Sequence, residues 1–180
     1  MKAFVFLAKG FEEIEAITPI DILKRAGMEV DTVSITSNKE VVGAHGIIVV
    51  ADYIFDDADF SDADLLFLPG GMPGTTNLDA HEGLKSLIQE QMHDDKLVAA
   101  ICAAPSILGR MGLLKGKEAI CYPGFEDQLM GATISNNSVV KSGNIVTGKG
   151  AGVAVQFALK LVEELKGKDV AAKIASAICI

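Results

Sequence analysis

A buried strand runs directly into a helix in the segment Val98-Ala99-Ala100-Ile101-Cys102-Ala103-Ala104-Pro105. The residues 97–101 are all apolar, which is typical of a central strand in a parallel sheet. Pro105 suits the first turn of a helix over 104–111, because the N–H that proline lacks has no partner there. Cys102 lies between the two elements with small residues after it. We therefore predict a tight, strained turn that places the sulfur at a helix N-terminus.

Cysteine at such a position can carry chemistry. The free N–H groups and the dipole of the following helix favour the thiolate, which is the nucleophilic form. The arrangement is similar to the nucleophile elbow of hydrolases, built on cysteine. The alternative is an inert core cysteine, since cysteine is among the most buried residue types. Cys121 and Cys179 open no helix, so for them we favour this second interpretation.

Strands and helices alternate along the rest of the chain, which predicts an α/β fold with a parallel sheet covered on both sides. We expect strands over 2–8, 29–35, 41–42, 46–51, 64–68, 97–101, 118–122, 139–141 and 144–147, and helices over 11–26, 78–93, 104–111, 151–165 and 170–178. Ligands bind outside the carboxyl ends of the strands in such a sheet. The informative strand ends are therefore 9–15, 69–74 and 102–105.

The first two of these ends contain groups that can assist Cys102. Gly70 and Gly71 can present backbone N–H groups to a developing oxyanion, although taken alone a simple turn after a strand explains them better. Glu12, Glu13 and Glu15 begin the first helix, where the dipole by itself favours solvated carboxylates. A buried, protonated carboxyl that reached Cys102 would act differently, because it could donate a hydrogen bond to the thiolate.

Composition narrows the remaining possibilities. The 180 residues fit one domain over 1–180, and the net charge of −8 with no basic stripe makes nucleic acid an unlikely structural partner. Three scattered cysteines and three scattered histidines predict neither a disulfide framework nor a metal site. We expect no signal peptide and no membrane span, and hence a cytoplasmic protein. A dinucleotide-binding fingerprint follows the first strand of its fold, whereas the Gly148–Gly152 run lies near the C-terminus. We therefore expect close backbone packing there and no dinucleotide binding.

Taken together, the motifs at 7–15, 68–71 and 99–105 resemble the ThiJ/PfpI superfamily, closest to the Parkinson-associated protein deglycase branch and its bacterial relatives. The resemblance covers nearly the whole chain. It implies a flavodoxin-like (class I glutamine amidotransferase-like) three-layer sandwich with a mainly parallel central sheet, a homodimer, and no cofactor. It also implies that Cys102 is the nucleophile, that Glu15 is its protonated partner, and that the amides of Gly70, Gly71 and Ala103 face the oxyanion.

Three positions depart from the family pattern. Tyr122-Pro123 stands where the deglycase branch has a histidine before the proline, and a phenol with a pKa near ~10 is a poor base at neutral pH. His45 stands where those relatives often have an arginine near the dimer interface. Ala103 stands where the peptidase branch has a histidine. We list Tyr122 and His45 as auxiliary residues and expect proteolysis to be the weakest option.

These features support two main hypotheses of different kinds. The first is a weak, cofactor-independent glyoxalase or deglycase (a lyase or hydrolase) in which Cys102 attacks small reactive aldehydes or glycated protein side chains. The second is a non-enzymatic redox sensor or chaperone that acts through oxidation of Cys102. An intracellular cysteine peptidase is a third and weaker reading. The sequence does not decide between enzyme and sensor.

Overall fold

Seven strands form the central sheet in the order β10-β11-β7-β6-β1-β2-β5, in a computed structural model that describes residues 1–180. Every neighbouring pair is parallel except β10 and β11. The mainly parallel sheet that we predicted is therefore confirmed. The strands are β1 (Lys2–Leu7), β2 (Glu29–Ser34), β5 (Tyr53–Ile54), β6 (Leu65–Leu68), β7 (Leu97–Ile101), β10 (Val139–Ser142) and β11 (Ile145–Gly148).

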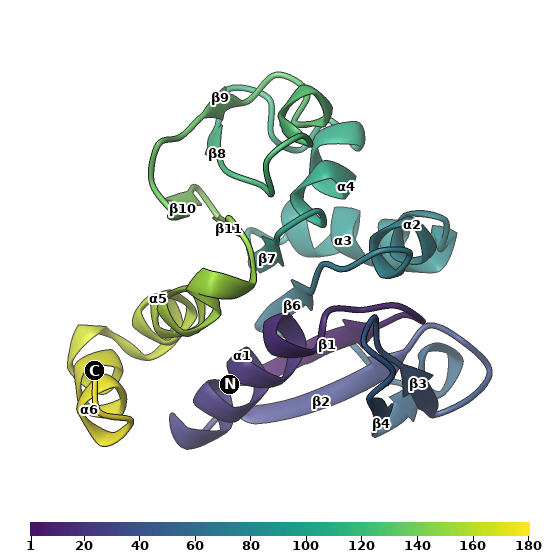
Figure 1. Ribbon diagram of the computed structural model, residues 1–180, viewed down its shortest axis with the longest axis horizontal. Helices are drawn as coiled ribbons and strands as arrows, with labels where there is room; N and C mark the ends of the chain where they lie inside the picture. The colour runs from purple at the N-terminus through teal and green to yellow at the C-terminus, as the bar shows by residue number, and fades with distance from the viewer.

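Helices cover both faces of the sheet (Figure 1). Alternate side chains of β1 enter different cores, because successive residues of a strand point to opposite faces. Val5 and Leu7 join the core beneath α1 (Glu13–Arg25), α5 (Ala154–Lys166) and α6 (Lys168–Ala177). Phe4 and Phe6 join the core beneath α2 (Gly74–Asp79), α3 (Glu82–His93) and α4 (Pro105–Arg110). The result is the flavodoxin-like three-layer arrangement.

Two small pairs of strands lie outside the main sheet. β3 (Glu40–Val42) and β4 (Ile48–Val50) form an antiparallel hairpin, and β8 (Glu118–Ala119) pairs with β9 (Thr133–Ile134). The hairpin is tied to the loop between β1 and α1, since the Gly10 N–H donates to the Val42 carbonyl at 2.8 Å. Figure 1 shows the hairpin and the β8–β9 pair at opposite ends of the molecule. Short 3-10 turns occupy Phe55–Asp57, Glu126–Gln128 and Ala151–Val153.

Some predicted boundaries are wrong. We expected a single helix over 78–93, but the helical conformation is interrupted at Ala80–His81, between α2 and α3. The His81 ring accepts the Leu84 N–H at 3.0 Å and so caps the start of α3. The strand expected over 118–122 ends at Ala119, and the amide of Ile120 then turns to Thr147 Oγ1 at 3.0 Å. We missed β5 and β9, which have two residues each and give no periodic signal.

The register brings four strand ends to one edge of the sheet. Leu68 of β6 lies beside Ala100 of β7, and Gly148 of β11 lies beside Ile101. β1 runs parallel to β6, so its end at Leu7 reaches the same edge. The loops that follow β1, β6 and β7 therefore meet, as we expected from the three informative strand ends. None of the helices has the length and apolar character that a bilayer crossing requires.

Candidate active site

Cys102 occupies a strained backbone position at the carboxyl end of β7. Its φ is +64°, a conformation that residues with a side chain rarely adopt. The surroundings hold it there: the Cys102 N–H donates to the Gly148 carbonyl at 2.9 Å, and the Cys102 carbonyl accepts the Tyr122 N–H at 2.8 Å. Strain fixed in this way is common at functional sites. The predicted tight turn is present.

Glu15 is the buried carboxyl beside this turn. Its side chain is almost fully enclosed, although it lies in the first turn of α1. Glu15 Oε2 accepts the Gly70 N–H at 3.0 Å, and its other contacts include the thiol of Cys102. Pro19 follows four residues later and has no N–H, so the Glu15 carbonyl lacks its usual helical partner. The structure thus brings Glu15 to Cys102.

Burial raises the pKa of Glu15 from its ordinary value of 4.5 to about 7. The hydrogen bond to Cys102 opposes this rise, the negative charge of Glu12 adds to it, and the amides of Gly70 and Ala151 lower the value slightly. A carboxyl with this pKa is half protonated near neutral pH. It can therefore both accept and donate a proton under physiological conditions.

Gly70 leaves room for the contact between these two side chains. A Cβ atom at Gly70 would lie 2.6 Å from the Cys102 Cβ and 2.6 Å from Glu15 Oε2, which no real side chain tolerates. The Gly70 N–H is already donated to Glu15, so it is not free for an oxyanion in this structure. The N–H groups of Gly71 and Ala103 instead face the sulfur, where they act to lower the thiol pKa.

The prediction that the helix N-terminus favours the thiolate of Cys102 is wrong for this geometry. Burial, together with the charge and hydrogen bond of Glu15, raises the pKa of the thiol from 9.0 to about 12, although the amides of Ala103 and Gly71 act to lower it. The following helix, α4, has only six residues and contributes little. Part of the rise depends on an ionised Glu15, so protonation of Glu15 eases ionisation of the thiol. The two groups therefore titrate as a pair.

Comparison with known proteins shows the family of this chain. The DJ-1/PfpI family model matches residues 1–164. The chain belongs to the DJ-1/PfpI family. It is 40% identical over 175 residues to protein DJ-1 homolog B of Arabidopsis thaliana, covering 96% of this chain. It is 32% identical over 171 residues to the glutathione-independent glyoxalase DJR-1.2 of Caenorhabditis elegans, covering 94% of this chain and 90% of that protein.

Solved structures of the DJ-1/PfpI family agree with the fold. Oxidised Toxoplasma gondii DJ-1 superposes with a TM-score of 0.95 at 38% identity, covering 98% of this chain and 97% of that one. The match covers less than half of the length of the Arabidopsis relatives. The chain spans 40% of the length of DJ-1 homolog B and 45% of that of homolog A.

The two auxiliary residues lie in different places in this DJ-1/PfpI chain. Tyr122 is half exposed at the rim of the site, and its ring lies beside Gly150, 3.4 Å from where a Cβ of Gly150 would be. His45 is in the turn of the β3–β4 hairpin and contacts Glu13, not Cys102. The groups that influence the titration of Cys102 include no histidine.

Glu12, Glu13 and His45 form a cluster that the scattered histidines did not predict. Glu13 is buried rather than solvated, and its carboxylate accepts the His45 N–H at 2.7 Å and meets the ring Nδ1 at 2.8 Å. Glu12 caps α1 by accepting the Glu15 N–H at 2.7 Å. Ligand atoms of the three residues lie within 4.8 Å of one another. These hydrogen bonds account for the cluster, and we assign no ion to it.

The other cysteines and the glycine run complete the comparison with the sequence. Cys121 is buried as expected, and burial together with Glu126 raises its pKa to about 11. Cys179 is exposed near the C-terminus, contrary to the expectation of a buried cysteine. Gly148 packs closely as predicted: a Cβ there would lie 2.8 Å from the Phe157 ring. A groove of about 800 Å³ between α5 and α6 is separate from the Cys102 site.

Proposed function

We propose that the protein is a cysteine-dependent, stress-related enzyme that acts on reactive carbonyls, with glyoxalase or deglycase activity. The observation that carries the proposal is the contact between the thiol of Cys102 and the buried carboxyl of Glu15, at a backbone turn that is strained. The glyoxalase name of the Caenorhabditis elegans relative supports the class of substrate. Small 2-oxoaldehydes such as methylglyoxal, or glycated protein side chains, are the expected substrates.

In the first step, Cys102 Sγ forms a bond to the aldehyde carbon. The π electrons of the carbonyl move to its oxygen, and the thiol proton passes to the carboxylate of Glu15 and then to that oxygen. The product is a neutral hemithioacetal. With the pKa of Cys102 raised to about 12 and that of Glu15 raised to about 7, removal of the thiol proton by Glu15 during attack is the favoured route. The amides of Gly71 and Ala103 stabilise the transient oxyanion.

In the second step, Glu15 removes the proton from the former aldehyde carbon and returns it to the neighbouring carbonyl carbon, while the hydroxyl proton of the hemithioacetal moves to the oxygen of that neighbouring carbon. One carbon is oxidised and the other is reduced, so the hemithioacetal becomes a thioester of a 2-hydroxy acid. Water then hydrolyses the thioester, releases lactate from methylglyoxal and restores the thiol. Substrate and water balance the reaction. Position 122 holds a tyrosine where the deglycase branch has a histidine, and we therefore expect slow turnover.

The test is lactate formation from methylglyoxal. We expect Cys102→Ser to abolish it and Glu15→Gln to reduce it by about 10²–10⁴-fold, the usual contribution of a general acid–base group. Cys179→Ser is the matched control, because it removes an exposed thiol and should leave the rate unchanged. Equal rates for the wild-type protein and Cys102→Ser would refute the proposal.

Nothing in the geometry favours the alternatives over this proposal. A peptidase needs a histidine beside the nucleophile, and His45 lies against Glu13 instead. A redox sensor needs a thiolate that oxidises readily, whereas burial and the neighbouring Glu15 raise the pKa of Cys102 to about 12. Oxidation of Cys102 by mild peroxide, together with an absence of lactate formation, would favour the redox sensor over the enzyme.

A further inference from the structure

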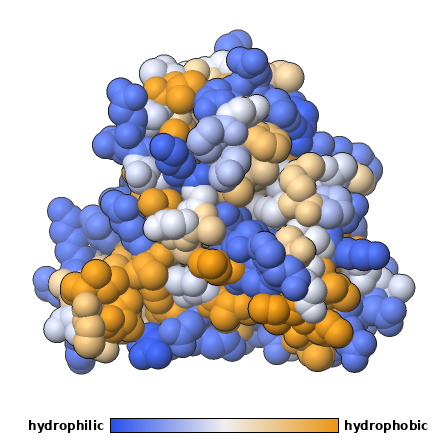
Figure 2. Space-filling model, in the orientation of Figure 1, coloured by the Kyte–Doolittle hydropathy of each residue, from blue (hydrophilic) through white to orange (hydrophobic).

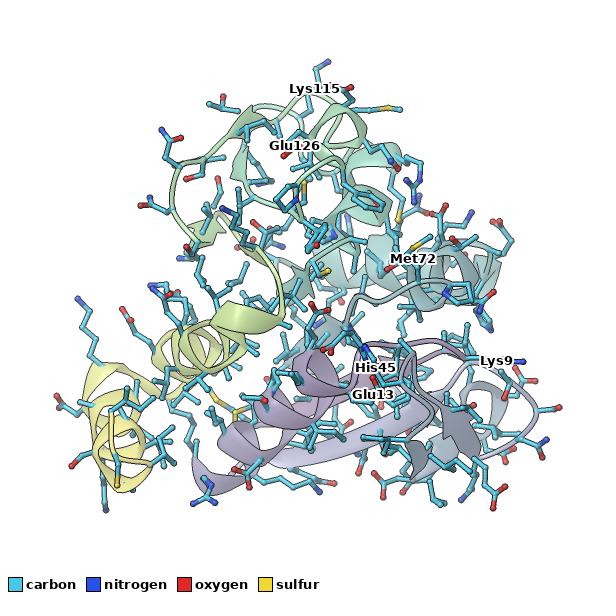
Figure 3. The ribbon with its side chains drawn as sticks, viewed as in Figure 1. Lys9, Glu13, His45, Met72, Lys115 and Glu126 are labelled. Atoms are coloured by element: carbon cyan, nitrogen blue, oxygen red, sulfur yellow. The ribbon has the colours of Figure 1, made fainter.

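A continuous set of contacts leads from the surface at His45 to the buried Glu15. The His45 side chain is 70% exposed, whereas that of Glu13 is only 7% exposed. Glu13 fixes the hairpin turn, because its carboxylate accepts the backbone N–H of His45 at 2.7 Å and contacts the His45 ring at 2.8 Å. Figure 3 shows Glu13 and His45 together beside the start of α1. The imidazole is thus held in one place although it is exposed in the single chain.

Glu12 connects this pair to the site. Its Oε1 lies 3.9 Å from the His45 ring nitrogen, and its Oε2 accepts the Glu15 N–H at 2.7 Å. The Glu12 N–H donates to the Gly70 carbonyl at 2.9 Å, and the Gly70 N–H donates to Glu15 at 3.0 Å. Glu12 is therefore bonded to the backbone of Glu15 and to the loop that holds the Glu15 carboxyl.

The charges of His45 and Glu12 act in opposite directions on the protonation of Glu15. His45 faces two carboxylates, those of Glu12 and Glu13, and both favour its protonated form. Glu15 faces the charge of Glu12, the thiol of Cys102 and the amides of Gly70 and Ala151. The Glu12 charge helps Glu15 to keep its proton, because two nearby anions repel each other. A positive charge on His45 offsets the charge of Glu12.

We propose that His45 is a positioning residue for the Glu15–Cys102 pair: its ring, held by Glu13 beside Glu12, sets the pH range over which Glu15 carries its proton. The inference deepens the proposed function, since it concerns the same two groups. Protonated His45 favours release of the Glu15 proton at lower pH. Neutral His45, or an uncharged side chain in its place, lets Glu15 keep its proton to higher pH.

The experiment follows the Glu15 carboxyl by NMR of protein labelled with ¹³C-glutamate, with the signal assigned through Glu15→Gln. We expect His45→Gln to raise the titration midpoint of Glu15 by roughly half a pH unit, the effect of one charge acting through partly solvated surroundings. His45→Lys, which keeps the charge, should titrate at or below the wild-type midpoint. The increase caused by His45→Gln should shrink at about 1 M salt.

His93→Gln is the matched control, since it removes an exposed histidine from α3 on the opposite face of the sheet. It should leave the Glu15 midpoint unchanged. Equal midpoints for the wild-type protein and His45→Gln would overturn the inference. So would equal upward shifts in His45→Gln and His45→Lys, because the ring shape and not the charge would then matter. The titration needs no carbonyl substrate, so a failure of the proposed enzyme activity would be seen separately.

Discussion

At the scale of single residues, the site depends on groups that are unfavourable where they stand. Cys102 holds a positive φ, and Glu15 is a carboxyl buried in the first turn of a helix. Each is tolerated because neighbours supply specific hydrogen bonds: Gly148 and Tyr122 hold the backbone of Cys102, and Gly70 binds the carboxyl of Glu15. The reactive pair is therefore maintained by the fold, at a cost in stability.

That cost predicts a pH dependence of folding. The pKa of Glu15 is about 7 in the folded protein against an ordinary value of 4.5. Between these two values the folded state binds more protons than the unfolded state, so stability falls as pH rises through this window. The full shift corresponds to at most about 3 kcal/mol. We expect Glu15→Gln to remove this part of the pH dependence.

Urea unfolding at pH 5 and pH 8 measures the effect. The wild-type protein should lose more stability than Glu15→Gln between the two pH values. Glu82→Gln serves as the control, because Glu82 is an exposed carboxylate of α3. If wild-type protein and Glu15→Gln lost the same amount, Glu15 would not be the buried acid that we describe.

At the scale of elements, the ends of helices matter more than their middles. The start of α1 supplies a cap from Glu12, an anchor for the hairpin from Glu13 and the buried carboxyl of Glu15. On the other face of the sheet, the segment after β6 makes two helices because His81 caps the second. Side-chain hydrogen bonds at these ends therefore fix where the loops around the site begin and end.

The cap at His81 can be tested directly. We expect His81→Ala to destabilise the protein by about 1 kcal/mol, since the Leu84 N–H loses its acceptor. His81→Ser should recover most of that loss. Both variants lose the contact between the His81 and Phe55 rings, whose centroids are 4.5 Å apart, so their difference isolates the cap. Equal urea midpoints for the two variants would show that the hydrogen bond contributes little.

At the scale of the whole molecule, one apolar surface is without a partner in the single chain. Ile14 and Ile17 of α1 are 55% and 41% exposed, and Ile47, Ile48 and Val50 around the hairpin are 57%, 58% and 65% exposed. Figure 2 shows apolar side chains along the lower part of the molecule, both over α1 and the hairpin and, at the lower left, over α6. Contiguous apolar surface of this kind commonly marks an interface.

We expect this surface to join two copies of the chain, as the family resemblance implies. Sedimentation equilibrium should report a dimer for the wild-type protein. Ile48→Glu should shift it toward monomer, because the charge would be buried without a partner in the interface. Met130→Glu is the control, since Met130 is 55% exposed near β9, at the other end of the molecule. A wild-type monomer, or a dimer unaffected by Ile48→Glu, would contradict this expectation.

The sequence by itself determined the architecture and the place of the site. Buried strands such as 97–101 and amphipathic helices can be predicted from the spacing of their apolar residues. The turn at Cys102 was predictable because a strand, small residues and Pro105 follow one another directly. The resemblance of three motifs then identified Glu15 and the Gly70–Gly71 loop. Each of these inferences uses residues that are neighbours in the chain.

Only the tertiary structure decided how these groups interact. Burial, which raises the pKa of Glu15 and Cys102, depends on the fold, which brings the loop after β6 (Gly70, Gly71) and the segment before α5 (Gly150, Ala151) to these two side chains. The use of the Gly70 amide by Glu15, and the meeting of His45 with Glu13 across 32 residues, have no local signal. Proton affinities are set by desolvation and by charges in space, so they follow from the folded arrangement and not from the order of residues.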